Sequence, residues 1–366
     1  PTLWLHNVTS TTAQYDGQDG VQYGFYTIAT DNAGNVEAAP AQADAVILVD
    51  TTPPTSAVDA LPIYGNQNTF TVSWAGNDPS TGIASGLATF DVFVSTDGTT
   101  FTPWLTDTVL MSALYTGSGV SGLYWFYSLA TDHAGNIQAA PSYTATTLVD
   151  LEKPVSAVDA LPTYRGPSFA VAWSGSDTGG SGLLDYTVYY TTSLNATPVA
   201  WLLDTTNTSA TFTGAVDGVT YYFYSIARDQ AGNVEDATGP DAHISIDITP
   251  PSSAVEVLPT YTASLTFTVR WSGADATSGV ASYDVYTSTD GITYHRWLND
   301  VAGTSAIFTG VSGQTYRFYS RATDWAGNEE AAPGTADAET LVDGVAPTSA
   351  ASSPAYSTAA AFAVTW

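Results

Sequence analysis

The sequence predicts an all-β protein of tandem seven-stranded Greek-key β-sandwiches, joined like beads on a string. One observation is the motif D-x-A-G-N, which returns at intervals of 101, 97 and 95 residues. The other is a series of short segments with alternating apolar and polar residues, separated by turn residues about every ten positions. Since about a hundred residues is a common size for one domain, each repeat is expected to fold as one sandwich.

Three markers share this period. The D-x-A-G-N motif begins at Asp31, Asp132, Asp229 and Asp324. An apolar run that ends in Asp, with Pro shortly after it, ends at Asp50, Asp150, Asp247 and Asp343. Two sets of tryptophans keep the same step: Trp74, Trp173, Trp271 and Trp366, and Trp4, Trp104, Trp201 and Trp297. The period is too long for a solenoid of short repeats, so separate domains are expected.

The Pro-bearing linkers set the predicted boundaries. Whole sandwiches are expected at residues 51–150, 151–247 and 248–343. Residues 1–50 are predicted to be the C-terminal half of a preceding repeat, and residues 344–366 the N-terminal part of a further one. The chain is therefore expected to be a piece of a longer protein.

Within each repeat the pattern is that of strands and turns. Tyr316, Phe318, Ser320 and Ala322 alternate with the residues between them, which is typical of a half-buried strand. Residues 70–74, 124–127, 221–224, 283–286 and 305–308 are predicted strands of the same kind. Asp-Gly pairs at Asp97, Asp217 and Asp290 predict tight turns.

Residues 313–324, G-Q-T-Y-R-F-Y-S-R-A-T-D, resemble the F strand of fibronectin type III domains, and Trp271 and Tyr286 fit strands B and C. The D-x-A-G-N and V-D-x-x-P-P elements are similar to tandem immunoglobulin-like repeats of bacterial surface proteins. This resemblance covers essentially the whole chain and implies the sandwich fold. It implies little about function, because such sandwiches host many unrelated activities.

The charge balance narrows the choice of partners. The chain has 35 acidic and 7 basic residues, a net charge of −28, so nucleic acid and anionic membrane surfaces are not expected to bind. Cations are the expected partners. Cysteine is absent, which excludes disulfides and thiolate metal sites. No apolar run reaches the ~18 residues of a membrane span.

No enzyme signature is found, so the chain is predicted to be non-catalytic and without an organic cofactor. Neither H-E-x-x-H nor G-x-S-x-G occurs. Gly117, Gly119 and Gly122 match G-x-G-x-x-G, but a predicted strand follows them. A phosphate site of this type needs the N-terminus of a helix, so a Gly-rich loop is the expected structure.

One constellation of carboxylates recurs. Successive strands of a sandwich run between its two poles, so the B–C loop, the F–G loop and the Asp that ends the preceding repeat should meet at one pole. Three sets are predicted: Asp50, Asp78 and Asp132; Asp150, Asp177 and Asp229; Asp247, Asp275 and Asp324. Oxygen atoms from Glu152, Asn136, Asn233 and Asn328 are expected as additional ligands.

Close carboxylates repel one another unless a cation or hydrogen bonds offset their charge. Oxygen ligands without His or Cys suit Ca²⁺, so the first hypothesis is that Ca²⁺ stiffens each junction. Resemblance to calcium-stiffened bacterial repeats supports it. The alternative is that each Asp caps a turn by accepting backbone N–H groups.

The two tryptophan sets allow different interpretations. Trp74, Trp173 and Trp271 lie in apolar strand runs and are predicted core residues. Trp104, Trp201 and Trp297 follow a turn, where they either pack on the sandwich edge or offer a stacking surface to sugar. Packing is the favoured interpretation.

The predicted function is that of a structural repeat segment in an extracellular or cell-surface fibre, stalk, surface layer or adhesin shaft. Its expected partners are neighbouring copies of the same chain, joined by edge-strand pairing. The first alternative is an adhesin module that binds cell-surface polysaccharide or a receptor. The second is a set of spacer domains in a large secreted hydrolase. The sequons at Asn7, Asn195 and Asn207 leave glycosylation open.

Overall fold

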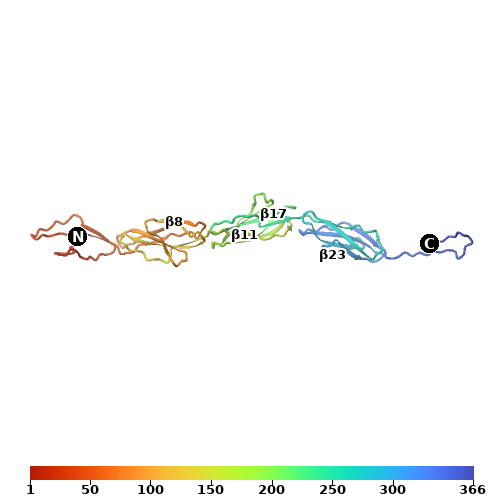
Figure 1. Cartoon of the computed structure of the whole chain (residues 1–366), viewed down its shortest axis with the longest axis horizontal. Helices are drawn as coiled ribbons and strands as arrows, with labels where there is room; N and C mark the ends of the chain where they lie inside the picture. The colour runs from red at the N-terminus through yellow and green to blue at the C-terminus, as the bar shows by residue number, and fades with distance from the viewer. The chain divides into compact units, whose positions relative to one another are not determined.

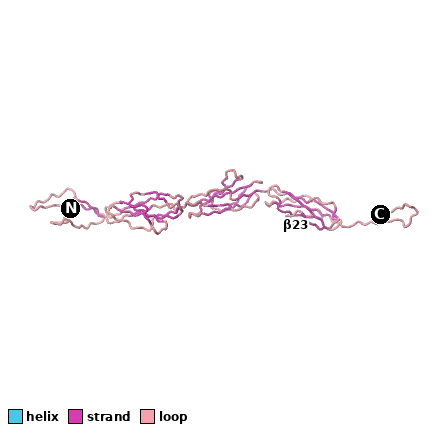
Figure 2. The backbone as a smooth tube through the Cα atoms, in the orientation of Figure 1, coloured by secondary structure: helices cyan, strands magenta, loops and turns pink.

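The computed structural model describes all residues, 1–366, and consists of strands, turns and loops without helices (Figure 2). It contains no helix with the length and hydropathy of a membrane span. By contact density the chain divides into two compact units. One unit comprises Pro1–Ser156, Gly175–Tyr186 and Ile226–Asp236, and the other Ala157–Ser174, Thr187–Ser225 and Ala237–Trp366.

The N-terminal segment contains one antiparallel hairpin. Strand β1 (Val21–Phe25) pairs with β2 (Ala45–Val49), with Val21 opposite Val49. The rings of Trp4 and Tyr15 pack against Phe25 of this hairpin, with centroid distances of 5.7 and 5.2 Å. Residues 344–366 contain only an isolated bridge between Ser352 and Thr365.

The first sandwich consists of a three-stranded and a five-stranded sheet, and Figure 1 labels its strand β8. Its strands are β3 (Thr55–Val58), β4 (Tyr64–Gly65), β5 (Thr69–Asn77), β6 (Leu87–Ser95), β7 (Thr102–Thr108), β8 (Ser112–Thr116), β9 (Gly122–Asp132) and β10 (Ala145–Val149). The orders are β3-β5-β8 and β4-β10-β9-β6-β7.

The second sandwich repeats these two sheets, and Figure 1 labels its strands β11 and β17. Its strands are β11 (Val155–Val158), β12 (Tyr164–Arg165), β13 (Ser168–Ser176), β14 (Leu183–Thr191), β15 (Val199–Thr205), β16 (Ser209–Thr213), β17 (Thr220–Asp229) and β18 (Ala242–Ile246). The orders are β11-β13-β16 and β12-β18-β17-β14-β15.

The third sandwich has the same orders, β19-β21-β24 and β20-β26-β25-β22-β23. Its strands are β19 (Ser252–Val255), β20 (Tyr261–Thr262), β21 (Thr266–Ala274), β22 (Val280–Ser288), β23 (His295–Val301), β24 (Ser305–Thr309), β25 (Thr315–Asp324) and β26 (Ala338–Val342). The predicted all-β class of tandem β-sandwiches is confirmed.

The first strand of each sandwich changes sheets, which makes eight named strands from the seven predicted. In the first sandwich β3 pairs antiparallel with β5, whereas β4 pairs parallel with β10. Pro62 lies between β3 and β4. Because proline has no N–H to donate to a ladder, it interrupts the strand at this point. Pro162 and Pro259 occupy the same place in the other two sandwiches.

A buried tryptophan lies at the centre of each core. Trp74, Trp173 and Trp271 are 2%, 1% and 1% exposed, as predicted. The second set also packs inward: the rings of Trp104, Trp201 and Trp297 lie 6.2, 6.3 and 6.5 Å from these partners, centroid to centroid. Packing, the favoured interpretation, is therefore the observed one.

A tyrosine at the start of each F strand fixes the turn before it. The hydroxyl of Tyr124 accepts the N–H of Ser118, and Tyr221 and Tyr316 accept those of Val216 and Val311. This is the arrangement known as a tyrosine corner in β-sandwiches. Since that turn faces the linker to the next sandwich, the tyrosine also positions the residues that hold the linker.

Candidate metal centres

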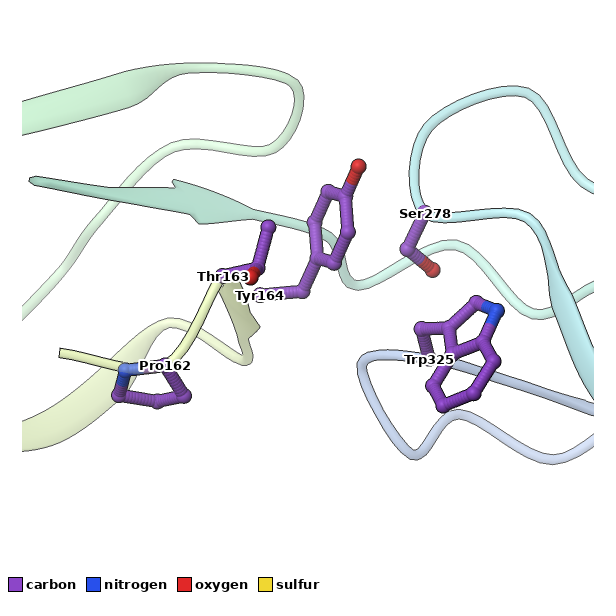
Figure 3. A pocket seen from close by; sticks show the side chains of 5 residues that line it. All are labelled: Pro162, Thr163, Tyr164, Ser278 and Trp325. Carbon is purple, nitrogen blue, oxygen red and sulfur yellow. The ribbon is translucent and has the colours of Figure 1, made fainter.

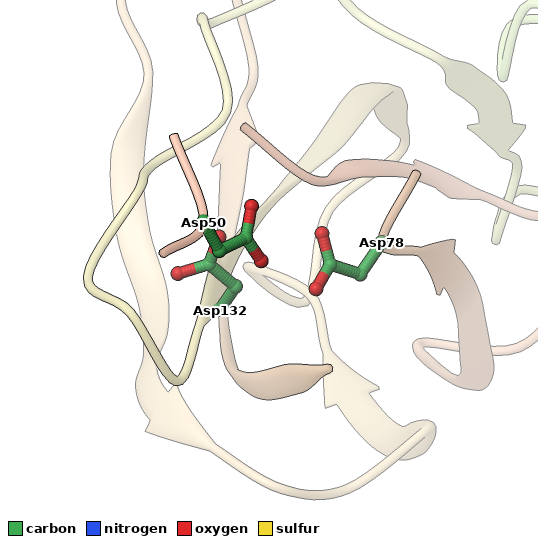
Figure 4. A group of neighbouring side chains, drawn as sticks. All are labelled: Asp50, Asp78 and Asp132. Atoms are coloured by element: carbon green, nitrogen blue, oxygen red, sulfur yellow. The ribbon is translucent and has the colours of Figure 1, made fainter. Parts of the chain in front are cut away.

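The three predicted carboxylate sets each come together at one pole of a sandwich. In the first, Asp50 follows β2, Asp78 follows β5, and Asp132 ends β9. One oxygen from each lies within 4.8 Å of the other two, and the same holds for the sets Asp150, Asp177, Asp229 and Asp247, Asp275, Asp324. Figure 4 shows the Asp78 carboxylate directed toward Asp50 and Asp132. Their predicted proximity is therefore observed, while metal binding stays a prediction.

Two members of each set are buried and the third is half-buried. Asp150, Asp229 and Asp247 are 0% exposed, and Asp50, Asp132 and Asp324 are also buried. The B–C loop residues Asp78, Asp177 and Asp275 are the half-buried members. At 4.8 Å and an effective dielectric constant of ~20, each pair of charges repels by about 3 kcal/mol. Each set therefore requires hydrogen bonds or a cation that offset this repulsion.

The F–G aspartate receives both of its hydrogen bonds from one asparagine. Asp132 Oδ1 accepts the Asn136 N–H, and Asp132 Oδ2 accepts its Nδ2, both at 2.8 Å. Gly135 has φ of 92°, which favours glycine at this position of the turn. Asn233 and Asn328 bind Asp229 and Asp324 in the same way.

The same asparagine also holds the linker. Its Nδ2 donates to the backbone carbonyl of Asp50 at 3.0 Å, and Asn233 and Asn328 repeat this bond to Asp150 and Asp247. The side-chain oxygens of these asparagines were expected as ligands. That expectation was wrong, because the nitrogen end of the amide faces the carboxylates.

The linker aspartate accepts backbone N–H groups from two directions. Asp50 Oδ1 accepts from Thr52 and Asp50 Oδ2 from Ser85, at 3.2 and 2.7 Å. The Ser85 N–H, followed by the Ser85 hydroxyl, lowers the pKa of Asp50, although burial and the charge of Asp19 oppose this. Asp150 and Asp247 accept equivalent bonds. The backbone N–H of Glu152 is one of these donors.

Hydrogen bonds do not use all the carboxylate oxygens of the B–C loop aspartates. Asp78 Oδ2 accepts the Gly86 N–H at 2.6 Å, whereas Asp78 Oδ1 is buried and has no hydrogen-bond partner. Asp177 accepts from Gly179 and Gly182. Asp275 Oδ1 takes three backbone N–H groups, from Thr277, Ser278 and Gly279. The capping interpretation thus accounts for many, but not all, of these oxygens.

A second set of side chains binds the linker from the preceding turn. Asp19 Oδ1 accepts the Thr51 N–H at 2.7 Å, and Asp217 Oδ1 accepts that of Ile248 at 2.9 Å. Ser121 and Ser312 use their hydroxyls for the N–H groups of Leu151 and Gly344. The role of these residues at the linker was not predicted from the sequence, although Asp217 was a predicted turn residue. The sequence feature that could have identified them is an Asp or Ser a few positions before each F strand.

A hollow lies next to Trp325. Pro162, Thr163, Tyr164, Ser278 and Trp325 line it (Figure 3). It brings together no nucleophile and base, and Trp325 is 67% exposed. His133 hydrogen-bonds the carbonyl of Gly86 through Nδ1.

No family model matches the chain. It is 30% identical over 313 residues to exoglucanase B of Cellulomonas fimi, a match that covers 79% of this chain and 26% of the relative. It is 31% identical over 182 residues to chitinase A1 of Niallia circulans, covering 48% and 24%. The chain thus spans about a quarter of the length of these curated relatives.

Solved structures of similar type include domains FN1–FN3 of chicken CNTN1 (13% identity, 79% of this chain and 99% of that chain, TM-score 0.32). The fibronectin(III)-like modules of Clostridium thermocellum CbhA are another (14% identity, 53% and 94%, TM-score 0.27).

Proposed function

We propose that this chain is a non-catalytic spacer segment of a longer secreted protein that acts on polysaccharide. The observation that carries the proposal is the built linker: the same hydrogen bonds hold the chain where one sandwich ends and the next begins. At the first linker Asp19 binds Thr51 and Asn136 binds the Asp50 carbonyl. A flexible tether would not need these bonds.

The relatives support the context of the spacer. Their names are those of an exoglucanase and a chitinase, and the matched region is about a quarter of each. Both names denote enzymes that act on a polysaccharide, and a string of sandwiches would hold other domains of such a protein at a defined separation. The low content of basic residues also leaves few sites for trypsin-like proteases.

Small-angle scattering of the whole chain tests the spacer. The wild-type chain is expected to give a pair-distance distribution with a well-defined maximum dimension. Asn136→Ala, Asn233→Ala and Asn328→Ala together should broaden it, because each substitution removes a bond to the linker carbonyl. If wild type and triple variant give the same broad distribution, the linkers do not restrict the chain and the proposal fails.

A second candidate is the shaft of a surface fibre, in which copies associate side by side. It is favoured by exposed apolar side chains on an edge strand, Leu114 on β8 and Ile307 on β24. Edge strands offer unpaired backbone groups to another chain. Sedimentation that depends on concentration in wild type, and not in Leu114→Lys, would favour the fibre.

A further inference from the structure

We infer that each carboxylate set is a binding site for a Ca²⁺-class divalent cation, with a serine hydroxyl as an additional oxygen ligand in the second and third sandwiches. This inference does not depend on the spacer proposal. It requires an observation beyond the closeness of acidic groups, and the structure provides one in the serines that follow the B–C aspartates.

The hydroxyls of Ser181 and Ser278 are buried without a hydrogen-bond partner. The two residues are 3% and 8% exposed, and their N–H groups donate to Asp150 Oδ2 and Asp247 Oδ2. A buried hydroxyl without a hydrogen-bond partner is unfavourable, because it has lost its bonds to water. This hydroxyl recurs in two sandwiches, each time on a residue whose N–H binds an aspartate of the set, and it marks a position for a further partner.

The first sandwich differs at this position. Ser85 holds the same place before Gly86, and its hydroxyl accepts the Ala134 N–H at 3.3 Å. Here the atom without a partner is instead Asp78 Oδ1, on a side chain directed toward the other two carboxylates (Figure 4). Every set therefore contains an oxygen for which the protein supplies no donor.

The donor chemistry selects the cation. Three carboxylates and a hydroxyl are hard oxygen ligands, and no set includes His. Ca²⁺ takes 6–8 oxygens in flexible geometry, so second carboxylate oxygens and water complete its shell. Mg²⁺ demands near-ideal octahedral geometry and gives up water reluctantly, so it is expected to bind more weakly here.

Cation binding would be coupled to the linker. The aspartate that begins each linker is a member of the set, and its carbonyl is held by the asparagine that also binds the F–G aspartate. A cation on these carboxylates would offset their repulsion and keep the linker residue in place.

The test is calorimetric titration of the whole chain with CaCl₂ after removal of metal by EDTA. The expected result is three sites per chain and a rise of melting temperature of several degrees. Asp78→Asn, Asp177→Asn and Asp275→Asn should each remove one site, and the triple variant all three. No heat and no rise at millimolar CaCl₂ would overturn the inference, as would unchanged stoichiometry in the triple variant.

Melting in EDTA distinguishes a cation site from a turn cap. Without metal, Asp78→Asn should be at least as stable as wild type, because it removes one close charge and its amide oxygen still accepts the Gly86 N–H. The control is Asp97→Asn, whose carboxylate lies in a turn outside the sets and binds Thr99 and Thr100. It should leave three Ca²⁺ sites. A loss of stability in Asp78→Asn, with Ca²⁺ binding intact, would assign the capping role instead.

Discussion

At the scale of the residue, one asparagine joins two functions. Its Nδ2 binds both the F–G aspartate and the carbonyl of the residue that begins the linker. The D-x-A-G-N motif predicts the turn, since Asp, Gly and Asn each have a known role in such loops. The bond to the linker was not predictable, because it joins residues 86 positions apart in the sequence.

Asn136→Ala is expected to destabilise the first sandwich by about 1–3 kcal/mol, because it removes two part-buried side-chain hydrogen bonds. Urea unfolding of the whole chain measures the change. Asn35→Ala is the matched control: it removes the same bond to Asp31 in an exposed turn. Equal effects of the two substitutions would show that the linker bond contributes nothing.

The lowered pKa values of two turn aspartates predict that the fold loses stability in acid. The N–H groups of Thr100 and Thr99, in that order, hold the pKa of Asp97 far below its usual value, and Ile292 and Thr293 do the same for Asp290. A lowered pKa in the folded state stabilises the fold above pH ~4, the unfolded pKa, and this contribution is lost as the pH falls toward the folded pKa.

The urea midpoint should therefore decrease from pH 5 to pH 2, and Asp97→Asn with Asp290→Asn should make that decrease shallower. Circular dichroism at each pH provides the measurement. An unchanged slope in the double variant would mean that these two carboxylates do not govern the acid response.

At the scale of the element, alternation predicted the strands well and the ends of strands less well. Tyr316, Phe318, Ser320 and Ala322 are all buried, as the period-2 pattern requires. The change of sheet within the first strand was not predicted. It depends on Pro62 interrupting one ladder and on the parallel pairing of Tyr64 with Leu148, a long-range contact without a local signal.

The first strand of each sandwich is tied by a residue after the F strand, and the tie differs between sandwiches. Glu235 accepts the N–H and the hydroxyl of Ser156, and also the Ala227 N–H. Gln138 instead accepts the Ser56 hydroxyl and donates Nε2 to the Ser56 carbonyl. Each residue type therefore fits the donors and acceptors of its own sandwich.

Exchanging the two types should destabilise both sandwiches. Glu235→Gln brings an NH₂ group toward two donors, and Gln138→Glu brings a carboxylate toward a carbonyl, so each should lose about 1–3 kcal/mol. Hydrogen exchange should show faster exchange in β11 and β3, respectively. If Glu235→Gln leaves protection of the Ser156 amide unchanged, the carboxylate does not hold the strand.

At the scale of the whole molecule, repetition made the candidate site predictable. Strand direction alone placed nine aspartates at three poles, because a sandwich alternates its strands between two ends. The serine hydroxyls and the linker-binding residues Asp19, Ser121, Asp217 and Ser312 escaped prediction. Their role depends on where a turn directs its side chain, which a tyrosine corner several residues away helps to fix.

The net charge of −28 predicts how salt acts on the molecule. NaCl should raise the melting temperature between about 10 and 300 mM, because screening weakens the repulsion among the acidic groups. Over this interval the screening length falls from well above to below ~10 Å. At matched ionic strength, CaCl₂ should raise the melting temperature further, whereas MgCl₂ should act nearly as NaCl does. Screening does not distinguish the two divalent cations, but a calcium site does. Scanning calorimetry in the three salts measures this difference. If the melting curves in CaCl₂ and MgCl₂ coincide, screening by divalent charge explains the calcium effect and no calcium site is needed.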